Sequence, residues 1–410
     1  MFSPVCARRQ MLGAALVIIL ATLVGCRGDV DGGDLDAIME YFEFTSTTSP
    51  TVSAAAERES CLTVDGLPGE CVMYYLCNSN GTANTDGSNV IDIRARDGPC
   101  TSYLDSCCLP PDIQIAPNVT PTPSSQRPGC GWRNPNGVGL LTIGDVDGEA
   151  KFAEFPWMVA ILRSKPLFNS GGLPSGQLMQ VYVGGGSLIH PSVVLTAAHV
   201  AGGGNLVARA GEWDTQTTKE PYPHQDRDVA RVVAHKQYNK NNLFHDVALL
   251  FLKLPMVLAP NVGLACLPPA GLNPLPGTRC LASGWGKDLF GQAGSYQVIL
   301  KKLELPVVDK RTCEGRLRGT RLGRYFQLHP TFMCAGGEKG KDTCNGDGGS
   351  PLVCPIPDQS DRYMQSGMVA WGIGCGEELT PGVYVDVASL RSWIDSTVAA
   401  AGLDTSVYTF

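Results

Sequence analysis

The cysteine residues constrain this chain more than any other feature of its sequence. Of the 16 cysteines, Cys6 and Cys26 fall in or at the end of an apolar N-terminal stretch, which leaves 16 − 2 = 14, an even set. An even set in a secreted chain is typical of a disulfide framework formed in an oxidising compartment. Six of the 14 crowd into residues 61–108, a module too short to build much core without bridges. Spacing alone does not select among the connectivities that six cysteines allow.

The N-terminus carries a targeting segment. Arg8 and Arg9 precede an apolar stretch from Met11 to Val24, which predicts a signal peptide over residues 1–26 and an extracellular protein. This stretch is short for a membrane span, which takes about 20 apolar residues. No later stretch is long enough, so the sequence predicts no membrane span.

Two further segments have a biased composition. Residues 27–60 are acidic and rich in Ser and Thr, so they have little to bury and are expected to be flexible. Residues 109–139 are rich in proline and are expected to form an extended linker. Two sequons, at Asn80 and Asn118, predict N-glycosylation of a secreted protein.

The charge balance excludes one class of partner. The chain carries 32 basic and 39 acidic residues, for a net charge of −7 and a sequence pI near 5.4. The charged residues are dispersed along the sequence, without a polybasic run. This balance argues against a nucleic-acid partner.

Three motifs after residue 190 resemble the triad segments of the trypsin-like serine proteases. The run from Val194 to His199 is similar to the segment that presents the general base. The run from His245 to Leu250 resembles the one that carries the buried aspartate, here Asp246. In a working enzyme the aspartate orients the imidazole, which takes the proton of the attacking serine. His199 and Asp246 therefore occupy triad positions.

The third motif lacks the nucleophile. Between Cys344 and Cys354, Gly348 stands where the family has its serine, so no hydroxyl is present to attack a peptide carbonyl. Ser350 is the nearest substitute, but two residues of extended backbone displace it by up to about 7 Å. A misplacement of about 1 Å already costs roughly 10²-fold in rate. The sequence therefore predicts an inactive homologue, with a weak protease that uses Ser350 as an alternative.

The resemblance also covers a substrate pocket. Asp342 matches the aspartate at the base of a trypsin-like specificity pocket, and Gly372 and Gly382 match the pocket walls. Two interpretations stay open here. The pocket binds an Arg or Lys side chain, or Asp342 is inherited and idle.

The resemblance implies an all-β-dominated fold, with a double β-barrel over residues 140–400, a helix over about 388–400 and a tail over 401–410. Apolar runs at 181–189, 193–196 and 247–252 are expected to be strands, since Gly and Pro turns separate them. At Gly184 and Val200 the family has a bridge beside the histidine, and this chain has none. The bridges that the family implies are Cys280–Cys354, Cys313–Cys334 and Cys344–Cys375, with Cys130–Cys266 tying the linker to the domain.

The N-terminal module resembles a clip domain of arthropod serine proteases, because the adjacent pair Cys107 and Cys108 ends its cysteine cluster. That resemblance places the clip domain at residues 61–108. It implies the bridges Cys61–Cys107, Cys71–Cys100 and Cys77–Cys108.

The whole mature chain resembles a clip-domain serine protease homologue of the prophenoloxidase-activating-factor type. The resemblance implies a secreted haemolymph protein that requires no cofactor molecule and assists an active clip-domain protease in converting prophenoloxidase, in melanisation. Prophenoloxidase and that protease are the implied partners, and self-association is a further expectation. The rival class is a protein that recognises microbial surfaces or mediates cell adhesion.

Two loops carry additional hypotheses. The segment from Leu140 to Asp145 has no basic residue of the kind at which active relatives are cut, and Arg96 in the clip module is a candidate processing site instead. The segment that begins at Gly211-Glu212 resembles the calcium-binding loop of the family, in which hard oxygen ligands converge. A structural Ca²⁺ at Glu212 and an exposed acidic loop are the two alternatives.

Overall fold

The structure is a computed structural model. It describes residues 59–63, 66–73, 100, 105–109, 127–138, 148–168, 174–217, 220–287, 296–340, 342–343, 346–374 and 376–410. Among these residues, no helix combines the length and the apolar character that a membrane crossing needs.

The N-terminal module is a three-stranded antiparallel sheet in the order β1-β2-β3. Two bridges, Cys61–Cys107 and Cys71–Cys100, hold it together. Cys108 is also disulfide-bonded, but its expected partner Cys77 lies outside the described residues. The strands are β1 (Ser60–Leu62), β2 (Pro68–Met73) and β3 (Asp105–Cys108).

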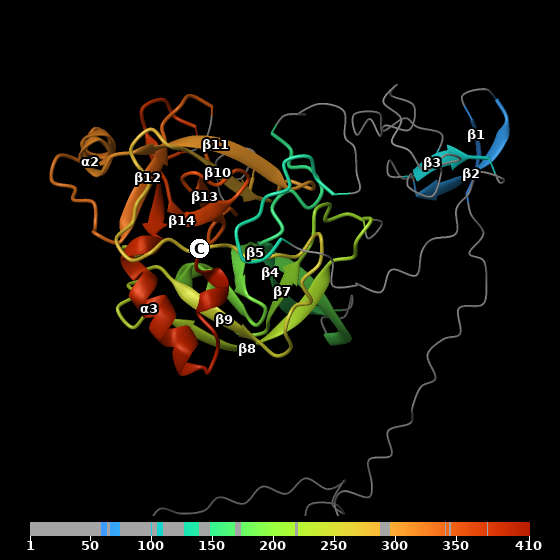
Figure 1. The fold of residues 1–410 in the computed structure, drawn as a ribbon, viewed down its shortest axis with the longest axis horizontal. Helices are drawn as coiled ribbons and strands as arrows, with labels where there is room; N and C mark the ends of the chain where they lie inside the picture. Colours follow the sequence, from blue (N-terminus) through green and yellow to red (C-terminus); the bar gives the residue numbers. More distant parts are fainter. Residues whose placement is uncertain are drawn as a thin grey trace, which may run out of the picture. The chain divides into compact units, whose positions relative to one another are not determined.

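A closed barrel of six antiparallel strands follows, in the order β4-β5-β6-β9-β8-β7 (green in Figure 1). Every residue of β6 and β9 is buried, as a short continuous apolar run predicts. The strands are β4 (Met158–Phe168), β5 (Pro174–His190), β6 (Val193–Thr196), β7 (Leu206–Ala210), β8 (Gln225–Ala234) and β9 (Ala248–Leu252).

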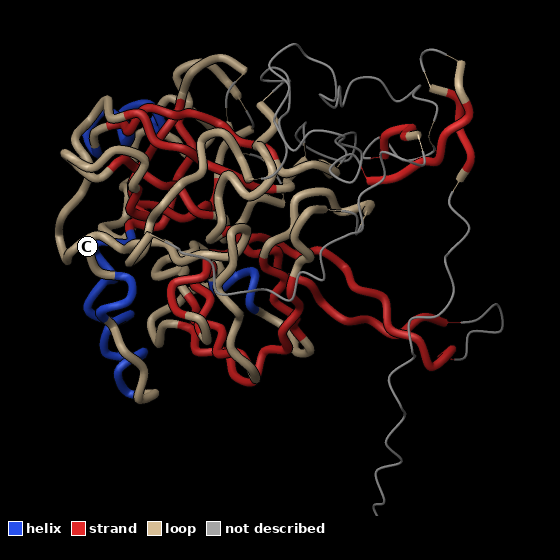
Figure 2. The backbone as a smooth tube through the Cα atoms, turned by 45° about the vertical axis from the view of Figure 1, so that its right-hand side comes forward, coloured by secondary structure: helices blue, strands red, loops and turns tan. Residues whose placement is uncertain are grey.

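The hairpin of β4 and β5 is longer than the apolar pattern predicts. The pairing of β4 with β7 ends at Arg163, and residues 164–168 pair only with β5. Figure 2 shows the two strands continuing as a ribbon beyond the barrel. Backbone pairing with β4 defines this part of β5, and the expected strand over 181–189 is the barrel-forming part of it.

The second barrel has the order β10-β11-β12-β15-β14-β13 (orange and red in Figure 1). The bridges Cys280–Cys354 and Cys313–Cys334 lie in it. Its strands are β10 (Arg279–Gly284), β11 (Lys301–Val308), β12 (Phe332–Gly336), β13 (Pro351–Pro355), β14 (Tyr363–Trp371) and β15 (Pro381–Asp386). The expected double barrel is therefore confirmed.

Helices occupy little of the described chain. The C-terminal helix begins one residue before the expected start, because the Asp386 side chain caps it by accepting a hydrogen bond from the Ser389 amide at 3.0 Å. Its buried face includes Leu390, Ile394 and Val398. The helical segments are α1 (Ala198–Ala201), α2 (Lys310–Arg318), α3 (Val387–Ala400) and the 3₁₀ turn η4 (Ser406–Tyr408).

The segment that precedes the first barrel is fastened to it twice. The bridge Cys130–Cys266 is the covalent link. The second link is the carboxylate of Glu154, which is fully buried. It accepts hydrogen bonds from the Arg133 guanidinium at 2.5 Å and from the Lys302 ammonium at 3.2 Å. Two cations thus balance one buried anion.

Replacing Glu154 by Gln should destabilise the fold strongly. The change leaves two partly buried cations without their shared anion, and breaking a buried ion pair on one side typically costs about 3–5 kcal/mol. Urea denaturation followed by tryptophan fluorescence measures the loss. The matched control is Glu304→Gln, since Glu304 is half exposed and pairs with Arg279 on the surface. An equal loss in both variants would contradict the role assigned to Glu154.

Candidate functional site

His199 and Asp246 meet because of the pairing of two strands. His199 lies on α1, immediately after β6, and Asp246 lies two residues before β9. In the antiparallel pairing of these strands, Thr196 lies opposite Ala248. This register brings two residues that are 47 positions apart into contact.

The aspartate holds the histidine at two points. The Asp246 carboxylate is fully buried and accepts a hydrogen bond from the backbone amide of His199 at 2.9 Å. Its other oxygen lies 2.6 Å from Nδ1 of the imidazole. The ring therefore has the orientation that a general base needs, with Nε2 directed away from the carboxylate.

Gly348 lies next to Nε2 of His199 and leaves little space there for a side chain. A Cβ atom placed on Gly348 would lie 2.5 Å from Nε2 and 3.1 Å from Cε1 of His199. A side chain at this position needs the imidazole to shift. The site thus lacks a hydroxyl, and it also lacks the volume that a serine side chain would fill.

Ser350 does not offer a second nucleophile. Its side chain is fully buried. It packs against Gly185 of β5, where an added Cβ would lie 2.1 Å from the Ser350 hydroxyl. The backbone amide of Ser350 donates to the carbonyl of Asp347 at 2.9 Å, and its carbonyl accepts from Val369 at 2.9 Å. The Ser350 hydroxyl therefore has no surface that a substrate could contact in this structure.

A valine fills the space beside the histidine where the family has a bridge. Val200 follows His199 on α1 and is buried. A Cβ atom on Gly184 would lie 2.8 Å from both γ-methyl carbons of Val200. Apolar packing thus replaces the covalent link at this point.

The pocket residue Asp342 lines a cavity of about 620 Å³ together with Thr343 and Asp347. Its Oδ2 accepts a hydrogen bond from the Gly376 amide at 3.4 Å. Burial raises the pKa of Asp342 to about 6. An added Cβ on the predicted wall residue Gly382 would lie 2.9 Å from Asp342 Oδ1, but neither Gly382 nor Gly372 is among the residues that line this cavity.

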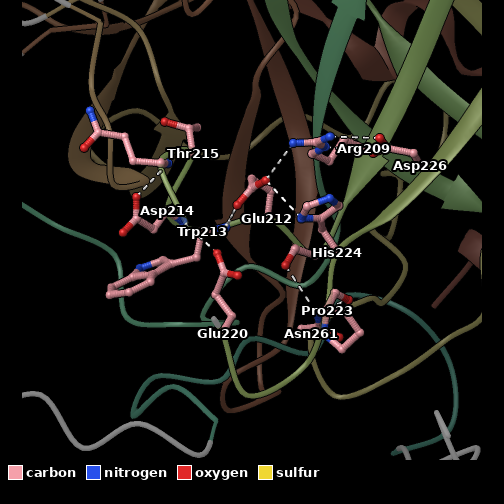
Figure 3. Close-up of polar contacts among 12 residues, drawn as sticks. Arg209, Glu212, Trp213, Asp214, Thr215, Glu220, Pro223, His224, Asp226 and Asn261 are labelled. Carbon is pink, nitrogen blue, oxygen red and sulfur yellow. Dashed lines mark hydrogen bonds and ion pairs between the residues drawn. The ribbon is translucent and has the colours of Figure 1, made fainter. Parts of the chain in front are cut away.

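The loop after β7 gathers charged groups around Glu212 (Figure 3). The Glu212 carboxylate is buried and lies 3.2 Å from the Arg209 guanidinium and 3.3 Å from Nδ1 of His224. Arg209 also pairs with Asp226 at 2.7 Å. The alternative of an exposed acidic loop is therefore wrong for Glu212.

A second carboxylate, that of Glu220, is buried in the same loop. One of its oxygens accepts from the Asp214 amide at 3.2 Å, and the other has no hydrogen-bond partner among the described residues. Burial, followed by the proximity of Glu212, raises the pKa of Glu220 to about 8.

Sequence reasoning missed Arg209, His224 and Glu220 in this loop. Arg209 could have been found, since it lies directly opposite Asp226 in the antiparallel pairing of β7 with β8. Nothing in the sequence placed His224 beside Glu212, because the backbone between them follows no regular element.

Several predicted positions lie outside the described residues. They are the sequons at Asn80 and Asn118, the processing site at Arg96, and Cys77, Cys344 and Cys375.

Known proteins place the chain in a family. A sequence model of trypsin matches residues 146–394, and one of the serine protease clip domain of PPAF-2 matches residues 59–109. Phenoloxidase-activating factor 2 of Galleria mellonella is 65% identical over 302 residues, which cover 73% of this chain and 99% of that protein.

Two further relatives mark the range of the similarity. Inactive CLIP domain-containing serine protease A8 of Anopheles gambiae is 38% identical over 360 residues, covering 85% of this chain and 93% of its own. Trypsin-3 of Salmo salar is 36% identical over 217 residues, covering 53% and 83%. The chain therefore belongs to the trypsin family and is a clip-domain serine protease homologue.

Proposed function

We propose that this protein is a secreted, non-catalytic cofactor for the proteolytic activation of prophenoloxidase in haemolymph. The position of Gly348 beside His199 is the observation that carries the proposal, because no hydroxyl lies next to the general base and an added Cβ would force the imidazole to shift. The 65% identity to a phenoloxidase-activating factor supports the pathway. Relatives named as inactive CLIP-domain proteases support the loss of activity.

The cofactor acts by presentation rather than chemistry. Its implied partners are prophenoloxidase and the clip-domain protease that cuts it. A chain that holds both on its surface raises their effective concentration without forming a new catalytic site. Two closed barrels suit this task, since they present loops on a rigid framework.

Phenoloxidase output tests this function. Purified prophenoloxidase is mixed with its activating protease, with and without the secreted chain, and the chain with prophenoloxidase alone controls for intrinsic proteolysis. The proposal predicts a large rise in output only in the three-component mixture. Unchanged output with a folded, processed chain would reject it in favour of microbial-surface recognition or adhesion, which binding to microbial polysaccharide would then test.

Restoring the serine should not restore proteolysis. In Gly348→Ser the new Cβ would lie 2.5 Å from Nε2 of His199, so the imidazole leaves its position as base. Hydrolysis of a chromogenic arginine anilide should stay at the background of the unaltered chain. The double variant Gly348→Ser with Ser350→Gly controls for crowding by the Ser350 side chain. Trypsin-like turnover in either variant would mean that only the hydroxyl was missing.

We also propose that the loop of Glu212 and Glu220 binds a structural Ca²⁺. Two buried carboxylates that lie side by side in one loop are the observation that fits a hard cation. Glu212 and Glu220 would supply the charged ligands, with backbone oxygens completing the site. The ion would supply positive charge that lets Glu220 ionise.

Calcium should raise the melting temperature, and the rise should grow with pH. The folded-state pKa of Glu220 is raised to about 8, so without the ion this group costs stability as pH increases toward that value. Calcium removes that cost, and its binding releases the Glu220 proton. Thermal unfolding with Ca²⁺ or EDTA at about pH 6 and about pH 9 measures the difference.

Glu220→Gln should abolish the response to calcium, and Glu304→Gln should preserve it. Because the glutamine is neutral, the Glu220 variant should also be more stable than the unaltered chain at alkaline pH in EDTA. A melting temperature that ignores Ca²⁺ at both pH values would remove the proposed ion.

A further inference from the structure

One surface of this acidic protein is strongly basic. Residues 310–324 contain six basic side chains and one acidic one, for a formal charge of 6 − 1 = +5 in a chain of net charge −7. This concentration corrects the expectation of evenly dispersed charge. The basic residues are Lys310, Arg311, Arg316, Arg318, Arg321 and Arg324, and we call this set the arginine surface.

The helix α2 presents part of this surface. Its buried side chains are Cys313 and Leu317, and Cys313 is bridged to Cys334 of β12. Arg311 and Arg318 are both exposed and lie seven residues apart, which is about two helical turns, or about 10 Å along one face. Figure 1 shows α2 at the outer side of the second barrel, beside β12.

The loop after α2 continues the surface in an ordered form. The Arg318 Nε donates to the carbonyl of Phe326 at 2.8 Å, which fastens the end of the loop to the helix. Arg321 and Arg324 are exposed. Tyr325 is 81% exposed, and the Arg324 guanidinium lies 4.7 Å from its ring centre.

Three of the six cations have an acidic neighbour among the described residues, since Lys310 lies near Asp386, Arg311 near Asp309 and Arg318 beside Glu314. Arg318 pairs with Glu314 at 2.5 Å. Within the described part of the chain, no ion pair involves Arg311, Arg321 or Arg324. Nearby Glu338 is already bound by Arg279 at 2.6 Å. Several exposed guanidinium groups are therefore free to meet an external anion.

The chemistry of the surface favours a protein partner. Five of the six cations are arginines, whose planar fork matches a carboxylate at two points. Arginine and tyrosine are also enriched in the cores of protein interfaces, where lysine is depleted. Leu379 adds an apolar side chain that is 60% exposed. Its backbone amide donates a hydrogen bond to the carbonyl of Gly337, and the Arg316 guanidinium lies beside Gly337.

We propose that the arginine surface is a docking site for an acidic polypeptide segment of a partner protein. This docking site goes beyond the proposed function, since binding to it requires neither the clip module nor the remnant triad. Complementary charge speeds association and selects partners, and salt screens it.

Binding of fluorescein-labelled poly-L-glutamate to the secreted full chain tests the site, with anisotropy read at about 0.05 and about 0.15 M NaCl. The triple variant Arg311→Gln, Arg321→Gln, Arg324→Gln removes only cations without ion pairs, so the fold should persist. Its Kd should rise about tenfold or more. The matched control Lys165→Gln, Lys236→Gln, Lys240→Gln removes the same charge from exposed lysines of the first barrel and should bind like the unaltered chain.

Three results would overturn the proposal. The first is equal weakening of binding in both triple variants, which would reduce the effect to net charge. The second is no binding of poly-L-glutamate by the unaltered chain. The third is arginine-dependent binding of heparin without binding of poly-L-glutamate, which would make the surface a polysaccharide site. If the triple variant is unstable, the single change Arg321→Gln decides in the same assay. Because phenoloxidase is not read out, failure of this site and failure of the cofactor function are distinguishable.

Discussion

The buried carboxylate of Asp246 is the constraint around which the first barrel and the site are arranged. A carboxyl group that is completely shielded from water must be paired or hydrogen-bonded, because its desolvation is otherwise costly. His199 satisfies it twice, through its backbone amide and its ring. The pair therefore remains useful to the fold after the nucleophile is gone. These two triad residues thus meet a structural demand that does not depend on a nucleophile beside them.

Short motifs predicted the parts of the structure that regular elements position. His199 and Asp246 lie at the ends of two buried apolar strands, so their contact follows from the pairing of those strands. The five bridges present among the described cysteines are pairs that the family resemblance implies. The double barrel follows from the family resemblance, and the apolar runs between turns mark only β5, β6 and β9 of the first barrel.

Other features depend on three-dimensional contacts that sequence spacing does not encode. The burial of Ser350 depends on the packing of β5 against it. The position of Val200, where the family has a disulfide, depends on how α1 packs. The environment of Glu212 comes from an irregular loop, to which His224 contributes from twelve residues away. The cations of the arginine surface are close in sequence but are interrupted by neutral residues, so they form no polybasic run; which of them are exposed depends on how α2 packs on the barrel.

The twofold fastening of the segment before the first barrel has a consequence for how this protein responds to proteases. Cys130 is bridged to Cys266, and Arg133 is bound by Glu154, so residues 130–133 belong physically to the barrel although they precede it in sequence. A cut between residues 138 and 148 would leave two polypeptides joined by a disulfide, separable only after reduction. A cut between residues 109 and 127 would instead break the backbone between the clip module and the barrels. A cut on the C-terminal side of Cys130 thus leaves the two polypeptides covalently joined, whereas a cut in the linker on its N-terminal side is not spanned by the Cys130–Cys266 bridge.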